Sequence, residues 1–476
     1  MERKVMILSA GVGSGHNSAA AALQRNLANR PDVSTVTTLD ILTTTPEFYR
    51  TVYDDGYFEM VAKAPWLVGW GYDQADAPFQ LGSRVPWWDQ INTTETVTRI
   101  KEFSPDIVLA THFLPARIVA NLQSSQELFT RMAIITTDYD VQGLWITNTF
   151  SRIFLAREES RQYLIASGFP EDRLTASGIP VRYEFGQQVD RPAVLAQFGL
   201  RDGVPILLIS AGAAGGPYAL RIVQQMQART EPFQAVVVCG HNADLKRDMD
   251  TLVGDDTDRF HVLGFTTAMP DLMRVASIFV GKPGGLSSSE AMAAGLPMAL
   301  INPIPGQEVR NSDYLLEQGA AVRNNYETTI GWKLGELLAD PARLERMRAA
   351  AQATGRPGAA STVVNDMLGD RDGQLWISDK AQRSLREASH LDKPDRPASP
   401  KQRLRTLIDT SSGRSVALIT DGQLKELSKV MWASGTGMTL ERARLREITT
   451  LQLDPTLVTM LRNVLAHRPD LKVSIT

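Results

Sequence analysis

The sequence predicts an α/β protein with two doubly wound, Rossmann-like domains that face a cleft, followed by a C-terminal extension. Two observations predict this fold class. A strand, a glycine-rich turn and a helix follow one another twice, near residues 5 and 205, and continuous apolar runs alternate with helix-like segments, as in parallel sheets covered on both faces. A chain of 476 residues fits two domains and a further piece. We therefore predict domains at 1–185 and 186–369 and an extension at 370–476.

In the first domain, the predicted strands are short apolar runs that each end in a turn. The first, at 5–10, leads into the glycine-rich turn 11–16 and a helix from 17. Three further strands are expected at 107–110, 132–136 and 153–155. Ligands of such sheets bind beyond the carboxyl ends of the strands, so the turns after these strands are candidate site segments.

Residues 47–92 interrupt this alternation with an aromatic, irregular stretch that holds four of the eight tryptophans. Two interpretations stay open. The stretch is either a helical excursion packed on the first domain, or an apolar acceptor pocket or membrane contact that includes Trp66 and Trp70, since tryptophan suits the boundary between water and lipid.

The second domain repeats the opening pattern. A strand at 205–210 leads into a second glycine-rich turn at 211–216, which contains Gly212. Further strands are expected at 235–239, 260–263, 278–281 and 298–301. Cys239 lies in the first of these apolar runs, which predicts a buried core thiol and not a nucleophile.

The C-terminal extension differs in composition from both domains. Residues 392–401 are rich in proline and charge and are typical of a linker. The segments 422–432 and 440–451 show a helical pattern with many basic residues. A small helical module, a contact with anionic lipid and a partner surface all remain open for this region.

Charge and cysteine content exclude several classes of protein. A net charge of −3 argues against a nucleic-acid binder that relies on bulk positive charge. The single cysteine excludes an intramolecular disulfide and a cysteine zinc site, and it fits a reducing cytoplasm. The apolar run near the N-terminus is too short for a signal peptide, and no run is long enough to cross a bilayer, so we expect a soluble or peripheral protein.

The turn at 281–290 is the most informative segment for function. It follows an apolar strand, contains Gly284 and Gly285, and leads into a helix that begins with Ser287 and Ser288. Glycines let the backbone approach an anion, and the free N–H groups of a helix end point at it. Glu290 lies one turn into the helix, where its carboxylate can reach ribose hydroxyls. The pattern indicates a nucleoside diphosphate site, although an ordinary strand–helix turn has the same residue types.

Two other turns of the second domain carry candidate ligand-binding residues. Phe265 follows the strand at 260–263 and could pack against a base, or the turn could be a simple connection. Gln307 and Glu308 follow the strand at 298–301 after a proline-rich loop, and an amide next to a carboxylate suits sugar hydroxyls.

The first domain carries the candidate acid–base residues. His16 ends the glycine turn and is a candidate general base, since the pKa of histidine lies near neutrality, although a structural role is also open. His112 follows the strand at 107–110, and a purely structural role is favoured for it. In the Asp-x-Asp sequence at 138–140, either carboxylate could hold a metal, act in acid–base chemistry or partner His16, and we prefer a catalytic-site carboxylate at Asp138 over a metal ligand. Two interpretations stay open for Arg182, which could contact a phosphate or form a surface ion pair.

These motifs together resemble a known group of enzymes. Residues 281–286, Glu290 and 303–308 resemble the donor half of the diacylglycerol glycosyltransferases, which include monogalactosyldiacylglycerol synthases and bacterial diacylglycerol glucosyltransferases and are similar to glycosyltransferase family 28. The turn that ends in His16 resembles the acceptor half, as do three later segments: 111–115, 137–140 and 178–181. The resemblance covers roughly residues 4–368, with the motifs in order along both halves.

The resemblance implies a GT-B fold and inverting transfer of a hexose from UDP-galactose or UDP-glucose to diacylglycerol, with no metal or other cofactor. It implies a cytoplasmic protein, peripheral on the inner face of an anionic membrane. Carried over residue by residue, His16 is the implied catalytic residue of the acceptor half, and Asp138 joins it from our interpretation of the Asp-x-Asp sequence. The implied donor-binding residues are Gly212, Phe265, Met269, Gly284, Gly285, Ser287, Ser288, Glu290, Gln307 and Glu308. The implied acceptor-binding residues are Gly15, His112, Trp66, Trp70 and Trp145.

One departure from the family pattern keeps two alternatives open. Where the family often has histidine after the Asp-Tyr-Asp-Val segment, this chain has Gln142, with Trp145 retained. If that histidine binds the acceptor or a proton in the family, we expect this chain to have an altered activity. The alternatives are therefore a transferase that acts on a polyprenyl-linked or soluble acceptor, and a non-catalytic UDP-sugar sensor that signals through its C-terminal extension.

Overall fold

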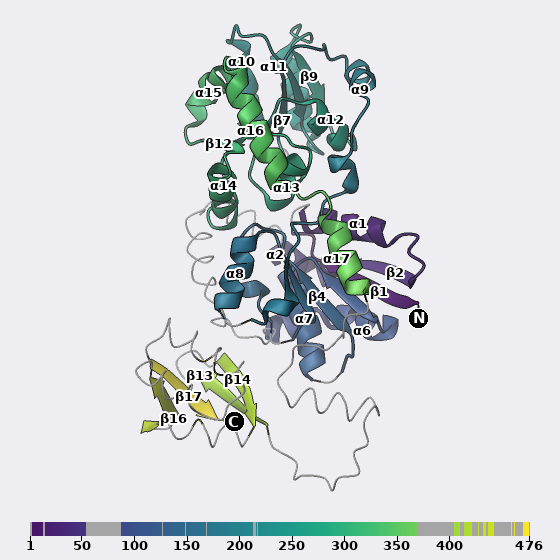
Figure 1. Ribbon diagram of the computed structural model, residues 1–476, viewed down its shortest axis with the longest axis vertical. Coiled ribbons are helices and arrows are strands. Elements are labelled where there is room, and N and C mark those ends of the chain that lie inside the picture. Colours follow the sequence, from purple (N-terminus) through teal and green to yellow (C-terminus); the bar gives the residue numbers. More distant parts are fainter. Residues whose placement is uncertain are drawn as a thin grey trace.

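Two sheet domains stacked one above the other form the main body of the protein (Figure 1). The computed structural model describes residues 2–12, 15–53, 87–125, 127–147, 149–167, 169–212, 216 and 218–369, and in the C-terminal part residues 404–409, 414–420, 427, 432–434, 437–441, 458, 461 and 470–475. All structural statements below concern these residues.

The first domain is a six-stranded parallel sheet in the order β2-β1-β3-β4-β5-β6. Its strands are β1 (Arg3–Ser9), β2 (Val33–Asp40), β3 (Ile107–Ala110), β4 (Arg131–Ile135), β5 (Arg152–Leu155) and β6 (Leu174–Ala176). Its helices are α1 (Gly15–Leu27), α2 (Glu47–Tyr53), α5 (Trp87–Asn92), α6 (Thr94–Phe103), α7 (Phe113–Ser124) and α8 (Glu158–Ala166), with short 3-10 turns η1 (Ile41–Thr44), η2 (Gly143–Trp145), η3 (Glu171–Arg173) and η4 (Tyr183–Gly186). The four strands predicted for this domain are confirmed, and β2 and β6 are additional.

The second domain is a six-stranded parallel sheet in the order β12-β11-β10-β7-β8-β9. Its strands are β7 (Ile206–Ser210), β8 (Gln234–Val238), β9 (Phe260–Leu263), β10 (Ile278–Gly281), β11 (Met298–Ile301) and β12 (Ala321–Asn324). Its helices are α9 (Arg191–Gln197), α10 (Tyr218–Gln227), α11 (Ala243–Val253), α12 (Met269–Val275), α13 (Gly285–Ala293), α14 (Gln307–Glu317), α15 (Ile330–Leu338) and α16 (Pro341–Thr354), with the 3-10 turn η5 (Glu327–Thr329). The predicted class of two doubly wound domains is confirmed.

Alternate strand residues supply a separate core on each face of both sheets. In β1, Met6 and Leu8 belong to one core, whereas Val5 and Ile7 belong to the other. In β7, Leu208 packs into one core and Leu207 into the opposite one. This two-sided burial explains why the central strands are continuous apolar runs. Cys239 is a buried free thiol whose pKa burial raises to about 11, as expected for a core position.

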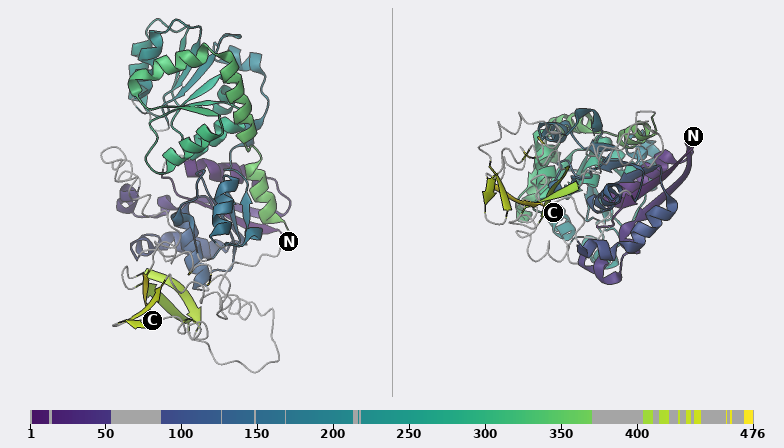
Figure 2. Two further views of the ribbon diagram at one scale, coloured as in Figure 1. Left: turned by 60° about the vertical axis from the view of Figure 1, so that its left-hand side comes forward. Right: turned by 90° about the horizontal axis from the view of Figure 1, so that it is seen from below.

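The last helix of the predicted second domain packs on the first sheet. Helix α17 (Ala359–Leu368) lies beside α1, as Figure 1 and Figure 2 show. Its buried residues share a core with β1, and Asp366 pairs with Arg152 of β5 at 3.3 Å. The chain therefore returns to the first domain before residue 369, and this return ties the two domains together.

The described part of the C-terminal extension contains a five-stranded sheet in the order β14-β13-β17-β16-β15, paired antiparallel throughout. Its strands are β13 (Leu404–Asp409), β14 (Arg414–Thr420), β15 (Trp432–Ser434), β16 (Gly437–Glu441) and β17 (Asp470–Ile475). The helical pattern at 422–432 and 440–451 is wrong at Trp432, Leu440 and Glu441, which lie in strands because neighbouring strands pair with them. The linker expected at 392–401 lies outside the described residues.

In the described part of the chain, no helix has the length and apolar composition needed to span a membrane.

Candidate active site

The donor-side turn leaves the start of a helix open. Strand β10 ends at Gly281 and α13 begins at Gly285, with Gly284 as its N-cap and no side chain capping the helix. The amide of Ser288 donates to the carbonyl of Gly284 at 3.0 Å and is the first one bonded within the helix. Helix geometry gives the amides of residues 285–287 no intrahelical acceptor. This open helix start is where the sequence predicts a diphosphate, and its binding of an anion stays a prediction.

Gly285 brings the two domains into contact. A Cβ placed on Gly285 would overlap the carbonyl oxygen of Thr137, which follows β4 in the first domain. At the next position, Leu286 lies 3.5 Å from a Cβ placed on Gly15, the first residue of α1. The turns at 11–16 and 281–285 therefore face each other across the domain boundary, and this close approach requires glycine at position 285.

Two carboxylates of the second domain lie near this turn. Glu308, in the first turn of α14, is buried and accepts a hydrogen bond from the Ile304 amide at 2.7 Å. Burial raises its pKa; Lys282 opposes this rise and Asp138 of the first domain adds to it. Burial raises the pKa of Glu290 to about 7, against the opposing charge of Arg182. The positive charge of Arg182 therefore acts on the carboxylate of Glu290.

The turn after β9 carries an aromatic pair that the sequence predicted only in part. The Phe265 side chain is 62% exposed, and its ring stacks on His241 with a centroid distance of 4.2 Å and an interplanar angle of 17°. Met269 follows as the first residue of α12. His241 was missed because a lone histidine after β8 carries no motif, and only the neighbouring strand order brings it beside Phe265.

His16 is held in one orientation on the acceptor side. Its Nδ1 lies 3.0 Å from the Thr111 carbonyl oxygen and 2.9 Å from Thr137 Oγ1. A carbonyl only accepts, so Nδ1 carries the proton and Nε2 keeps its lone pair. Burial lowers the His16 pKa to about 4, with the Thr111 bond and the charge of Asp40 opposing this shift. The ring is therefore neutral at pH 7.

Asp40 organises the turn that carries His16. At the end of β2, its carboxylate accepts hydrogen bonds from the Gly11 amide at 3.0 Å, the Leu42 amide at 3.1 Å and Asn17 Nδ2 at 2.9 Å. A Cβ on Gly11 would overlap this carboxylate, which explains the glycine. Asp40 was not predicted from the sequence because the strand that presents it was not recognised.

The other acceptor-side aromatic residues form a buried cluster. The His16 and His112 rings pack edge to face with centroids 4.5 Å apart, and Trp145 lies 6.3 Å from His112. His112 is the N-cap of α7, where Nδ1 accepts from the Leu114 amide at 3.1 Å. Trp145 is only 4% exposed. These contacts fit the structural role favoured for His112, and the acceptor contacts implied for His112 and Trp145 stay predictions.

The two aspartates of the Asp-x-Asp sequence have different partners. Asp140 is paired with Arg157 at 3.2 Å and with Arg310 at 3.1 Å, so arginines engage both of its oxygens. Asp138 accepts from Asn311 Nδ2 at 2.9 Å, and burial raises its pKa. The hydrogen bonds of His16 run to Thr111 and Thr137, so the interpretation of Asp138 as a carboxylate partner for His16 has no support.

Most of the remaining predicted residues lie in the described part of the chain, and two lie outside it. Gly212 has φ of 79°, which favours glycine, and Gln307 begins α14. Ser287 and Ser288 lie in the first turn of α13, and the buried Ser288 hydroxyl has no partner among the described residues. Trp66 and Trp70 lie outside the described residues. Gln142 is 7% exposed and precedes η2.

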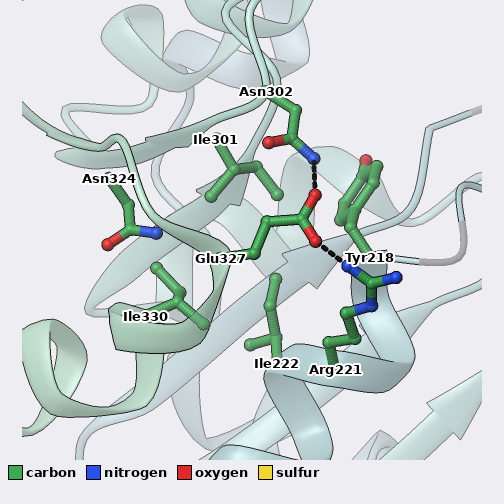
Figure 3. Close-up of a pocket in the computed structure, with 8 residues that line it drawn as sticks. All are labelled: Tyr218, Arg221, Ile222, Ile301, Asn302, Asn324, Glu327 and Ile330. Atoms are coloured by element: carbon green, nitrogen blue, oxygen red, sulfur yellow. Dashed lines mark hydrogen bonds and ion pairs between the residues drawn. The ribbon is translucent and has the colours of Figure 1, made fainter.

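A pocket of about 250 Å³ lies elsewhere, at the carboxyl ends of β11 and β12 (Figure 3). Its central carboxylate, Glu327, accepts from Asn302 Nδ2 at 2.9 Å and pairs with Arg221. The pocket's charged groups thus neutralise each other, unlike the open amides at the start of α13. Its remaining lining residues are Tyr218, Ile222, Ile301, Asn324 and Ile330.

Comparison with known proteins assigns both halves. Residues 16–181 match the monogalactosyldiacylglycerol (MGDG) synthase family, and residues 206–363 match the glycosyltransferase family 28 C-terminal domain. The first match begins after β1 and covers the other strands of the first sheet, and the second match spans the second sheet. In both halves the chain is similar to the diacylglycerol glycosyltransferases and to family 28. It is a glycosyltransferase with two Rossmann-like domains.

Curated relatives are similar to this chain over most of its length, and a solved structure shares its fold. A processive diacylglycerol beta-glucosyltransferase of Bacillus cereus is 28% identical over 371 residues, which is 78% of this chain and 95% of that protein. The protein of the same name from Bacillus mycoides is 27% identical over 371 residues, with the same coverage. A UDP-N-acetylglucosamine 2-epimerase structure from Listeria monocytogenes has a TM-score of 0.50 at 14% identity, covering 78% of this chain and 98% of that chain. That structure supports the fold alone.

Proposed function

We propose that the protein transfers a hexose from a UDP-sugar to the free hydroxyl of 1,2-diacylglycerol, with inversion at the anomeric carbon. The observation that carries the proposal is the position of Thr137 between the two glycine-rich turns. Its carbonyl faces Gly285 at the open helix start, while its hydroxyl lies 2.9 Å from His16 Nδ1. An anion bound at α13 and an acceptor hydroxyl near His16 would therefore lie side by side.

In the proposed reaction, the neutral ring of His16 accepts the proton of the lipid hydroxyl at Nε2. The resulting oxygen nucleophile attacks the anomeric carbon from the face opposite UDP, and the bond from that carbon to the phosphate oxygen breaks. The electron pair leaves with UDP. The free amides of residues 285–287 and the positive end of α13 stabilise the charge on the departing diphosphate.

The other donor residues take the roles implied by the family resemblance. Glu290 holds ribose hydroxyls, Gln307 and Glu308 hold the sugar, and Phe265 packs against the uracil. The names of the curated relatives favour glucose over galactose as the transferred hexose. No bound metal is part of the proposed reaction; the two arginines on Asp140 support this choice, since they occupy its oxygens.

A lipid acceptor requires contact with a membrane surface, and we place the protein as a peripheral protein on an anionic inner face. Phe48 on α2 and Ile91 on α5 are 66% and 64% exposed, and they lie near the two ends of the stretch 47–92. Changing both to serine is expected to weaken sedimentation with anionic vesicles. Trp332→Ser is the matched control, because this exposed tryptophan lies on α15 of the second domain.

The direct test is incubation with UDP-[14C]glucose or UDP-[14C]galactose and vesicles that contain diacylglycerol, followed by lipid extraction. Labelled monohexosyldiacylglycerol is the expected product, and proton NMR of its anomeric centre reports inversion. UDP binding without transfer to diacylglycerol, polyprenyl phosphate or soluble acceptors would favour the sugar-sensor alternative and contradict the proposal.

A further inference from the structure

Asn311 occupies a position that joins the two halves of the site. It lies on α14 one turn after Gln307 and Glu308, so the three side chains share one region of the helix. It is fully buried, with an exposed fraction of 0%. None of the motifs assigns a role to this residue, and the sequence around it shows no more than a polar helix start.

The Asn311 amide makes three hydrogen bonds to separate segments. Its Nδ2 donates to Asp138 Oδ1 at 2.9 Å and to the carbonyl of Pro283 at 3.1 Å. Its Oδ1 accepts from the Tyr139 amide at 2.9 Å. The reversed amide would turn an oxygen toward a carboxylate and a carbonyl, which are both acceptors, so the partners dictate the orientation.

The three partners belong to functionally different parts of the site. Pro283 directly precedes the glycine pair of the donor-side turn, whereas Asp138 and Tyr139 follow β4 on the acceptor side. A ligand that orders the donor-side turn therefore acts on the hydrogen bond between Asn311 and the Pro283 carbonyl. The same side chain also holds the carboxylate of Asp138, which the first domain contributes to the site.

Neighbouring contacts support the same segment from the second domain. Ser289 donates to the Tyr139 hydroxyl at 3.2 Å, and Arg310 pairs with Asp140 at 3.1 Å. The Tyr139 and Tyr314 rings are 4.6 Å apart. In these contacts residues 138–140 are held by α13 and α14 together, and Asn311 is the member that also bonds the donor-side turn.

We propose that Asn311 is a positioning residue that couples occupation of the donor turn to the placement of Asp138 for transfer. The inference deepens the proposed function and rests on it. Asn311 need not touch either substrate; it transmits the geometry of the 283–285 backbone to the acceptor side through one rigid side chain.

Loss of the amide is the first test. Asn311→Ala is expected to lower kcat by about 10- to 100-fold, the range for losing a hydrogen bond to a charged group, and to leave the Kd for UDP within about threefold. Asn324→Ala is the matched control, because Asn324 is 6% exposed and its Nδ2 donates to the Tyr326 carbonyl at 2.7 Å. This control should lose stability and keep kcat within about twofold.

The Asn311→Asp variant adds a second test, the pH dependence of kcat, which a purely structural role of Asn311 would not change. Asn311→Asp places a second carboxylate beside Asp138, where Asp140 and Glu308 already raise the local negative charge. A shared proton would restore a donor at this position. The kcat of Asn311→Asp relative to wild type should therefore rise as pH falls from 8 to 5.5, with the folded fraction followed separately by circular dichroism.

Hydrogen exchange separates failure of this inference from failure of the proposed function. In wild type, UDP should slow exchange of the Tyr139 amide, which donates to Asn311, and Asn311→Ala should abolish that slowing while UDP still binds. This readout needs no lipid acceptor. The inference is overturned if the slowing persists in Asn311→Ala, or if Asn311→Ala and Asn324→Ala lower kcat only in proportion to unfolding. Absence of labelled lipid with wild type would overturn the proposed function alone.

Discussion

The glycine-rich turns at 11–16 and 281–285 follow the same strand–turn–helix pattern, yet among the described residues a carboxylate is bonded only into the first of them. In the first, Asp40 accepts from the Gly11 amide at 3.0 Å and places a carboxylate beside the start of α1. In the second, Gly284 caps α13 without any side chain, and the next three amides lack an intrahelical acceptor. A glycine-rich turn before a helix is therefore an anion site only when the protein itself does not fill it.

The difference separates the chemistry of the two domains. The first turn presents His16, whose neutral ring is bonded to Thr111 and Thr137. The open turn supplies positive potential from backbone amides. Thr137 touches both, so the base and the proposed leaving group meet where the two turns approach.

The largest effect is expected from Gly285→Ala. The new Cβ would overlap the Thr137 carbonyl oxygen, so the two turns must separate and transfer should fall below detection. Gly358→Ala is the matched control, because its nearest atom, Ser361 Oγ, lies 3.7 Å away. The labelled-lipid assay measures both variants, with circular dichroism to confirm folding. Full activity of Gly285→Ala would show that the turns do not approach during transfer.

His16→Ala should separate the tasks of the two turns. Loss of the base is expected to lower kcat by about 10²- to 10⁴-fold, while the Kd for UDP measured by calorimetry stays within about twofold. His261→Ala, a histidine of β9 in the second domain, is the control. Equal losses in turnover and UDP affinity would contradict the assignment of His16 to proton transfer.

Asp40→Ala should show that the first turn is filled for structural reasons. Three donors lose their acceptor, so the free energy of unfolding should fall by about 1–3 kcal/mol, with UDP affinity unchanged. Asp32→Ala provides the comparison, since its ion pair with Arg30 is 36–38% exposed and weak. Urea denaturation measures the stability of both variants. An Asp40→Ala protein as stable as wild type would contradict the structural role of this carboxylate.

A smaller effect concerns pH and the open turn. The Glu290 pKa is raised by burial from 4.5 to about 7, so the folded state binds this proton more tightly than the unfolded chain. The free energy of unfolding should therefore fall as pH rises from 4.5 toward 7, by about 1–3 kcal/mol. Glu290→Gln should flatten this part of the profile. An identical pH dependence in the variant would place the titration elsewhere.

The sequence predicted the central strands well because their physics is local. Strands β3, β10 and β11 begin and end where the predicted apolar runs do, because every residue of these strands is buried. Strand β2 was not predicted. It is an edge strand with a half-exposed face of serine and threonine, so it lacks an apolar run.

The missed elements explain the missed site residues. Asp40 ends β2 and was lost with it, while His241 and Asn311 gain their roles from contacts with segments far along the chain. Sequence spacing cannot place such partners. In the C-terminal extension, the helical pattern predicted at 422–432 and 440–451 is wrong at Trp432, Leu440 and Glu441, because antiparallel pairing is a long-range property.

The most direct test of the central claim is a calorimetric titration of UDP into wild type and into Gly284→Asp. The substitution gives the turn before α13 an acidic N-cap that can accept from the helix amides and so compete with a bound anion. We predict saturable binding at one site in wild type and a loss of at least about 100-fold in Gly284→Asp. Absence of heat with folded wild type, or equal affinity in the variant, would contradict the claim that the open start of α13 binds the diphosphate.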